Sequence, residues 1–282
     1  MKHLAGLKEA EEVEEELDAR VFGNFLHNVM HRFYVELIEA KSTKEIVAGD
    51  LEKTTTSSKI DLLIDKEFIN HYKLDPEIEV EYKGQRLLVK EIVKQFAERI
   101  ILLDKEYAPF SIEMLEQENY SVEHEITTGK NYQVVKLAGR IDRVDKKDGV
   151  VRVIDYKTGA DSLTFKNIES FFMREGKRNK AAFQTVLYSW MYHKKESEAG
   201  IKILQLTPGL INRTSLFENQ FQWAFKLQQL KQQLNDVQPF LGEFEDRLSN
   251  LLQELFDPSV SFIQTKELNN CKFCAYKNIC RR

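Results

Sequence analysis

The chain has 282 residues, of which 30% are charged and 42% are hydrophobic, and its formal net charge is −4 at pH 7. This length allows a sizeable core, as one large domain or two small ones. With only 12 glycines and 5 prolines, the composition favours a helix-rich globular protein. The net negative charge offers no overall attraction to nucleic acid, so a site for a polyanion would have to be a local basic patch.

Hydrophobic residues do not gather into any run long enough to cross a membrane. The N-terminal segment, MKHLAGLKEAEEVEEELDAR, has no apolar signal core and contains an acidic helical run at 8–16 that we expect to be solvated. We therefore expect a cytoplasmic protein with no membrane partner.

A helix is predicted at 25–38, where apolar residues recur at helical spacing after the start signal Gly23-Asn24. It carries His27, and a histidine on a largely apolar helix is usually packed or surface-exposed, so the pattern alone leaves its role open. The next part, about 45–110, is predicted to be a helical insertion. Within it we expect a loop at 54–58, extended chain or helix at 80–88 and an amphipathic helix at 89–107.

A β-hairpin is predicted around Asp148-Gly149, the strongest short-range turn signal, because both flanking segments, 136–145 and 150–157, alternate in polarity. A two-residue loop there sets Asp142 opposite Asp155. Directly opposed Cβ atoms lie about 5 Å apart, so the two carboxylates would repel each other unless a cation lay between them.

Carboxylate oxygens suit Mg²⁺ or Mn²⁺, and Lys157, on the same face as Asp155, would direct its ammonium group at whatever the ion binds. The same register sets Arg140 opposite Lys157. The alternative is a solvent-exposed hairpin face with weak surface ion pairs. A preceding strand at 122–126 offers Glu123 or Glu125 as a third acid, unless both simply face solvent.

Basic and aromatic residues are interleaved after the hairpin, a pattern that can bind phosphates and stack on bases. The candidate DNA-binding residues, with Arg140 of the hairpin, are Arg174, Lys177, Arg178 and Lys180. The stretch would equally suit an amphipathic segment that covers the core. A helix follows at about 179–194, then a strand at 201–206 closed by Pro208-Gly209, and one or two helices at 221–255 broken near Pro239.

All three cysteines, Cys271, Cys274 and Cys280, lie near the C-terminus with the spacing C-x2-C-x5-C. In an intracellular chain this spacing indicates metal or cluster ligation rather than a disulfide. Three thiolates complete neither a tetrahedral zinc site nor a four-iron cluster, so a fourth ligand is missing.

The order of these features resembles the RecB/AddB-type nuclease domain of the PD-(D/E)XK superfamily. The resemblance rests on GRIDRVD followed by IDYKTG, on the helix with His27 before them, and on Gln184-x-x-x-Tyr188 and the cysteines after them. It implies an α/β fold with a restriction-endonuclease-like mixed β-sheet flanked by helices, a helical insertion and a C-terminal cysteine segment. One nuclease domain would span 1–282, with its catalytic core at 121–206 and a cysteine tail at 262–282.

The resemblance also implies a site for Mg²⁺ or Mn²⁺. Its ligands would be His27, Asp142, Asp155 and the backbone carbonyl of Tyr156. Lys157 would orient or activate the attacking water and stabilise charge on the phosphate. The DNA strand would be positioned by Gln184 and Tyr188.

These roles imply a metal-dependent DNA nuclease, more specifically an exonuclease of recombination and repair with a helicase partner. An alternative is a DNA-binding or scaffolding module of a helicase-nuclease complex, and a third interpretation is a hydrolase of another phosphate ester.

The cysteines resemble the C-terminal part of the [4Fe-4S] clamp of AddB-like members, in which a fourth cysteine precedes the helix with the histidine. This chain has no cysteine there. We therefore hypothesise that it is the C-terminal fragment of a longer protein with helicase-like domains and a complete cluster. If the native protein begins at Met1, a zinc site or free thiols become the better interpretation.

Overall fold

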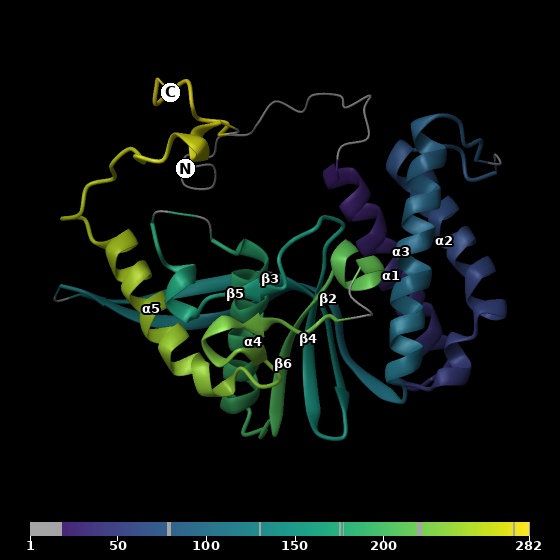
Figure 1. Ribbon diagram of the computed structural model, residues 1–282, viewed down its shortest axis with the longest axis horizontal. Coiled ribbons are helices and arrows are strands. Elements are labelled where there is room, and N and C mark those ends of the chain that lie inside the picture. The colour runs from purple at the N-terminus through teal and green to yellow at the C-terminus, as the bar shows by residue number, and fades with distance from the viewer. Residues whose placement is uncertain are drawn as a thin grey trace.

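The computed structural model describes residues 19–77, 80–129, 131–174, 176, 178–218, 222–272 and 274–281. The described residues form five long helices, a mixed five-stranded sheet and a small sheet of three short strands (Figure 1). The helices are α1 Ala19–Lys41, α2 Lys53–Tyr72, α3 Gln85–Tyr107, α4 Lys180–Glu198 and α5 Gln238–Phe256. The strands are β1 Glu45–Ile46, β2 Phe110–Thr128, β3 Asn131–Lys147, β4 Val150–Tyr156, β5 Thr164–Phe165, β6 Gln205–Ile211, β7 Lys226–Leu227 and β8 Gln232–Gln233. The small sheet has the strand order β5-β7-β8.

The main sheet has the strand order β1-β2-β3-β4-β6, in which only β4 and β6 run parallel. Each face of the sheet is covered by helices and has its own hydrophobic core. One core joins α1, α2 and α3 to the sheet, and the other joins α4 and α5 to it. In Figure 1 these two helical groups stand on opposite sides of the strands. The structure therefore has the mixed, helix-flanked sheet that the sequence predicts.

The β3–β4 hairpin has the predicted register, because Lys147 pairs with Val150 and the ladder continues to Arg143 and Ile154. Asp148 and Gly149 both have positive φ, 51° and 82°, as a two-residue type I′ turn requires. Asp142 and Asp155 follow one step beyond the Arg143–Ile154 pair. The local turn chemistry therefore places the two aspartates on one face of the sheet.

The opposite face of the same hairpin carries a buried ionic network. Arg143 donates hydrogen bonds to both carboxylate oxygens of Asp104 in α3, at 2.6 and 2.7 Å. Arg152 of β4 donates to both oxygens of Asp145, at 2.7 and 2.8 Å. The Tyr34 hydroxyl of α1 also donates to Asp104. This network ties α1 and α3 to the strands that carry the two aspartates.

The prediction of a loop at 54–58 is wrong, because α2 runs through this polar segment. Two of its hydroxyl groups have hydrogen-bond partners, one within the helix and one in α3, which lowers the cost of placing them there. Thr56 donates to the Glu52 carbonyl at 3.1 Å, and Ser57 donates to Glu98 of α3 at 2.8 Å.

Two predictions about prolines are also wrong. Pro208 lies inside β6 instead of ending it, since β6 is the last strand of the main sheet and proline is tolerated in such an edge strand. Pro239 does not interrupt a helix but begins one, because it occupies the first turn of α5, where a missing N–H costs nothing. The chain before α5 forms the short strands β7 and β8.

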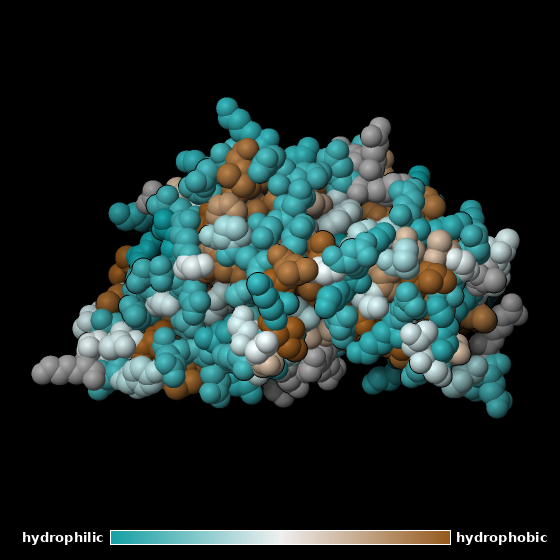
Figure 2. Space-filling view, turned by 90° about the horizontal axis from the view of Figure 1, so that it is seen from below, coloured by the Kyte–Doolittle hydropathy of each residue, from teal (hydrophilic) through white to brown (hydrophobic). Residues whose placement is uncertain are grey.

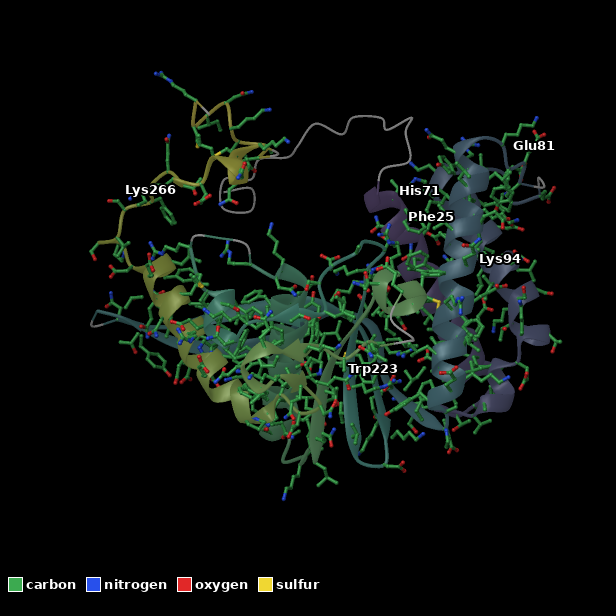
Figure 3. The ribbon with its side chains drawn as sticks, in the orientation of Figure 1. Phe25, His71, Glu81, Lys94, Trp223 and Lys266 are labelled. Atoms are coloured by element: carbon green, nitrogen blue, oxygen red, sulfur yellow. The ribbon has the colours of Figure 1, made fainter. Side chains whose placement is uncertain are left out.

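Aromatic contacts join α1 to α2 within the helical group, where the Phe25 ring lies 4.6 Å from Phe68 and 5.0 Å from His71 (Figure 3). Hydrophilic side chains cover most of the molecule seen from below, with small apolar patches between them (Figure 2). In the described part of the chain, none of the helices combines the length and apolar character needed to cross a bilayer.

Candidate functional site

A cavity of about 610 Å³ opens where α1, the middle of β3, the end of β4 and α4 meet. It brings together residues that are far apart in the sequence. The predicted site residues that line it are His27, Arg140, Asp142, Tyr156, Lys157, Gln184 and Tyr188. The fold thus gathers most of the site predicted from the sequence into one place.

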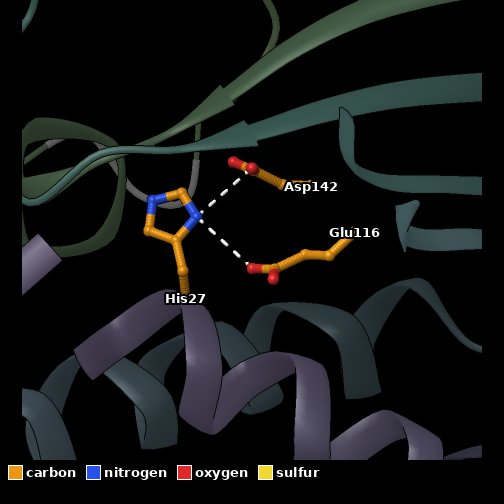
Figure 4. Close-up of side chains that lie close together, drawn as sticks. All are labelled: His27, Glu116 and Asp142. Atoms are coloured by element: carbon orange, nitrogen blue, oxygen red, sulfur yellow. Dashed lines mark ion pairs between the residues drawn. The ribbon is translucent and has the colours of Figure 1, made fainter. Parts of the chain in front are cut away.

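Three side chains in this region form a compact group of possible metal ligands (Figure 4). His27, Glu116 and Asp142 each offer one atom, and these atoms all lie within 4.8 Å of one another. His27 Nδ1 is 3.2 Å from Asp142 Oδ1 and 3.6 Å from Glu116 Oε1. An imidazole and two carboxylates converging on one point are a suitable ligand set for a divalent cation.

Glu116 is the site residue that the sequence reasoning missed. It has a positive φ of 32° beside an irregular step in the β2–β3 ladder, and this break turns its side chain into the site. Its Oε1 atom is buried, and apart from the 3.6 Å ion pair with His27 it has no hydrogen-bond partner among the described residues. Of the two interpretations offered for Glu123 and Glu125, the structure supports the exposed strand face, because both are exposed on β2 and neither belongs to the group.

Electrostatics hold this group together. Burial lowers the pKa of His27, but hydrogen bonding to Asp142 and then Glu116 outweighs burial and raises it to about 10. Burial raises the pKa of Glu116, but His27 and Arg140 outweigh burial and hold it below its usual value. A positive imidazolium therefore lies between two carboxylates in the place that a cation would take.

Asp155 lies beneath the cavity, almost fully buried, and outside the group of three ligands. Its oxygens are 3.0 and 2.9 Å from Lys157 Nζ. Burial and the charge of Asp142 raise the pKa of Asp155 to about 7, against the opposing effect of Lys157. Asp142 also accepts the Tyr156 backbone N–H at 2.7 Å, which fixes its carboxylate at the end of β4.

Gln184 and Tyr188 come from α4 and are joined by a 3.1 Å hydrogen bond from Gln184 Nε2 to the Tyr188 hydroxyl. The Tyr188 ring lies against Gly139 of β3. A Cβ atom at Gly139 would lie 2.5 Å from Tyr188 Cε1, so only glycine leaves room for this ring. The glycine of the GRIDRVD segment therefore sets how deeply α4 reaches into the site.

The predicted DNA-binding residues lie in two places, because Arg140 lines the cavity described above and Arg174, Arg178 and Lys180 line a second one. Arg140 forms an ion pair with Glu116 at the metal-ligand group, and Arg174 forms one with Glu254 of α5. Arg178 and Lys180 are exposed and line the second cavity beside α4. Lys177 lies outside the described residues.

The cysteine segment follows α5 as an extended, exposed chain above the sheet (Figure 1). Cys271, Cys274 and Cys280 are free thiols of intermediate exposure. Across the described residues they do not belong to any group of ligand atoms within 4.8 Å of one another.

Comparison with known families identifies the class of this fold and site. A model of the PD-(D/E)XK nuclease superfamily matches residues 1–281. The chain therefore belongs to the PD-(D/E)XK nuclease superfamily, as its hairpin and ligand group indicate.

Two curated proteins are similar to parts of the chain, and both are named as a subunit of an ATP-dependent helicase/deoxyribonuclease. The protein from Caldanaerobacter subterraneus subsp. tengcongensis is 27% identical over an alignment of 154 residues. The alignment covers 52% of this chain and 13% of that protein. The protein from Clostridioides difficile is 26% identical over an alignment of 180 residues. The alignment covers 58% of this chain and 14% of that protein. The chain thus corresponds to a small part of the length of these relatives.

Proposed function

We propose that this chain is a cytoplasmic, metal-dependent DNA nuclease that hydrolyses phosphodiester bonds, working as an exonuclease of recombination and repair beside a helicase. The observation that carries the proposal is the convergence of His27, Glu116 and Asp142 next to Lys157. The helicase partner is inferred from the names of the two relatives.

The residues of the group fit Mg²⁺ or Mn²⁺. Two carboxylates supply hard oxygen ligands, and the buried Glu116 Oε1 lacks any other partner among the described residues. Asp155 and the Tyr156 carbonyl complete our proposed ligand set. When bound, such an ion lowers the pKa of water and offsets negative charge on a phosphate.

The other side chains of the site have proposed roles around the scissile phosphate. Lys157 is positively charged, since Asp155 raises its pKa against the opposing effect of burial. It therefore stabilises the negative charge that develops on the phosphate and orients the attacking water. Gln184 and Tyr188, linked by their hydrogen bond, hold the strand against the cavity wall.

We further infer that Cys271, Cys274 and Cys280 are part of a [4Fe-4S] site in a longer parent protein. The support is their spacing and the limited share of each relative that the chain covers. A brown protein with visible thiolate-to-iron absorbance, purified from the full-length parent, is the expected result. A colourless parent without iron would contradict this inference.

A nuclease assay tests the central proposal. Linear DNA is incubated with Mg²⁺ or Mn²⁺ and one of three proteins. These are the unsubstituted 282-residue chain, called the parent chain from here on, its Asp155→Ala variant and its Lys157→Ala variant. We expect the parent to degrade DNA and both variants to lose activity while they still bind it. Equal degradation by parent and variants would reject the site. If the parent binds DNA but does not cleave it, the DNA-binding or scaffolding alternative replaces the nuclease.

A further inference from the structure

A second cavity of about 470 Å³ lies beside the first turns of α4, which also contribute to the catalytic cavity. It is formed by the start of α4, the C-terminal half of α5 and the segment after the short helix η2, Ile168–Phe171. Its walls include Phe172, Phe183, Arg174, Arg178, Lys180 and Arg247.

The two cavities are neighbours, because consecutive residues of α4 face them. Phe183 lines the second cavity and Gln184 lines the catalytic one. Lys180 and Gln184 are separated by about 6 Å along the helix axis, at 1.5 Å per residue. A single continuous polymer strand is long enough to contact both.

The charge of the second cavity is positive and partly uncompensated. Arg174 is neutralised by Glu254, and Arg247 lies 2.8 Å from Glu243. Arg178 and Lys180 have no acidic partner among the residues that the structure describes. The catalytic cavity, in contrast, is lined by the carboxylates of Asp142 and Glu67, so a polyanion that enters it needs cations nearby to hold it.

Aromatic rings supply the second feature of this cavity. Phe172 packs edge-on against Phe183, with ring centroids 5.7 Å apart, and both rings are half-buried. Each ring is held in place by the core on one side and reaches the cavity on the other. Fixed, partly exposed rings beside cations are the features that bind unpaired bases and their phosphates.

We propose that the second cavity binds a single nucleic-acid strand, with Arg178 and Lys180 on its phosphates and Phe172 and Phe183 against a base, while adjoining nucleotides occupy the catalytic cavity. The ligand is single-stranded because a duplex keeps its base faces stacked inside and offers none to these rings. This inference rests on the proposed function and specifies its substrate.

The binding test uses Arg178→Gln/Lys180→Gln, with Lys202→Gln/Lys231→Gln as the control, because these two exposed lysines line neither cavity. A fluorescent oligothymidylate and a blunt hairpin duplex are titrated by anisotropy in EDTA at several salt concentrations. We expect the first variant to bind the oligothymidylate more weakly. The slope of log K against log salt should fall in magnitude by about 1.4, because the variant removes two phosphate contacts and each contact on a single strand contributes about 0.7.

Unchanged affinity and slope in Arg178→Gln/Lys180→Gln would overturn the proposal. A loss of duplex binding as large as the loss of single-strand binding would overturn the single-strand assignment. Because EDTA removes metal, these outcomes stand whether or not the chain is a nuclease, so a failure of the second cavity is distinguishable from a failure of the proposed function.

A cleavage test links the cavity to the reaction. In Mn²⁺, we expect Arg178→Gln/Lys180→Gln to raise KM for a long single strand while kcat stays at the parent value. Hydrolysis of bis-p-nitrophenyl phosphate, which is too small to reach the second cavity, should be unchanged. An unaltered KM for the long strand would contradict the proposal.

Discussion

Glu116 allows a test of the metal group through a single residue, because its buried Oε1 has no partner among the described residues apart from His27. Glu116→Gln keeps the shape of the side chain but removes its charge. Since changes even in the groups around metal ligands cost about 10- to 100-fold in affinity, we expect Mn²⁺ affinity to fall by at least about tenfold. Isothermal titration calorimetry measures this loss.

The matched control for Glu116 is Glu123→Gln, which makes the same chemical change at an exposed position of the same strand. It should leave Mn²⁺ affinity unchanged. Equal affinities for the two variants would remove Glu116 from the site.

Metal binding should also release protons, because His27 and Asp155 hold protons that a cation displaces. With a pKa raised to about 10, His27 is protonated at pH 7, and with a pKa of about 7, Asp155 is about half protonated. Mn²⁺ binding at pH 7 should therefore release about one proton from His27 and a fraction from Asp155, and affinity should rise with pH. Calorimetry in buffers of different ionisation enthalpy counts these protons, and release that is unchanged in His27→Gln would contradict the assignment.

Gly139 controls the position of Tyr188, since a Cβ atom there would lie 2.5 Å from the Tyr188 ring. We expect Gly139→Ala to lower kcat by displacing the ring. If this is the mechanism, adding Gly139→Ala to Tyr188→Ala should cost little more than Tyr188→Ala alone, because the displaced group is already gone. Additive losses in a double-mutant cycle on kcat would show that Gly139 acts elsewhere.

At the scale of helices and strands, the buried network of Asp104 and Arg143 holds α3 and α1 against the catalytic hairpin. Asp104→Asn leaves the fully buried Arg143 without one of its carboxylates. Breaking a buried pair in this way costs about 3–5 kcal/mol, so we expect the free energy of unfolding to fall by that amount in guanidinium titrations.

The control for this network is Asp61→Asn, which removes the partner of Lys94 between α2 and α3, at 2.7 Å and in a more exposed position. Exposed pairs contribute about 0–1 kcal/mol. A similar loss in both variants would mean that burial does not distinguish the two pairs.

Elements defined by local chemistry were predictable from the sequence. The Asp148-Gly149 turn fixed the hairpin register, and the helix predicted at about 179–194 begins as expected, since Asn179 caps α4 by accepting the Ala182 N–H. Glu116 was not predictable, because its orientation depends on an irregular β2–β3 pairing rather than on its neighbours. Its segment, EMLEQENY, contains three glutamates, and no periodicity singles out the one that turns inward.

The polar helix segment at 54–58 and the edge strand with Pro208 were missed for a related reason. Their local patterns indicate loops and turns, but tertiary partners decide otherwise. Ser57 donates to Glu98 across the α2–α3 contact, and Pro208 lies in the last strand of the main sheet, next to the bridge between Gly209 and Ala224. The division of the chain into a helical insertion, a catalytic core and a cysteine tail stays a prediction.

For the molecule as a whole, stability comes from the two cores on the opposite faces of the sheet. Among the described residues, the last member of either core is Leu252 of α5. Beyond α5 the tail exposes even its large apolar side chains, such as Phe262 at 80% and Ile263 at 79%. These residues bury too little surface to contribute to folding.

We therefore expect truncation after Phe256 to change the free energy of unfolding by less than about 1 kcal/mol, as for surface changes in general. Guanidinium unfolding curves of the truncated and parent chains measure this difference. DNA cleavage by the truncated chain should equal that of the parent, because the ligand group and both cavities lie before the tail. A loss of several kcal/mol would mean that the cysteine segment packs against the domain in solution, and loss of cleavage alone would mean that it contributes to the site.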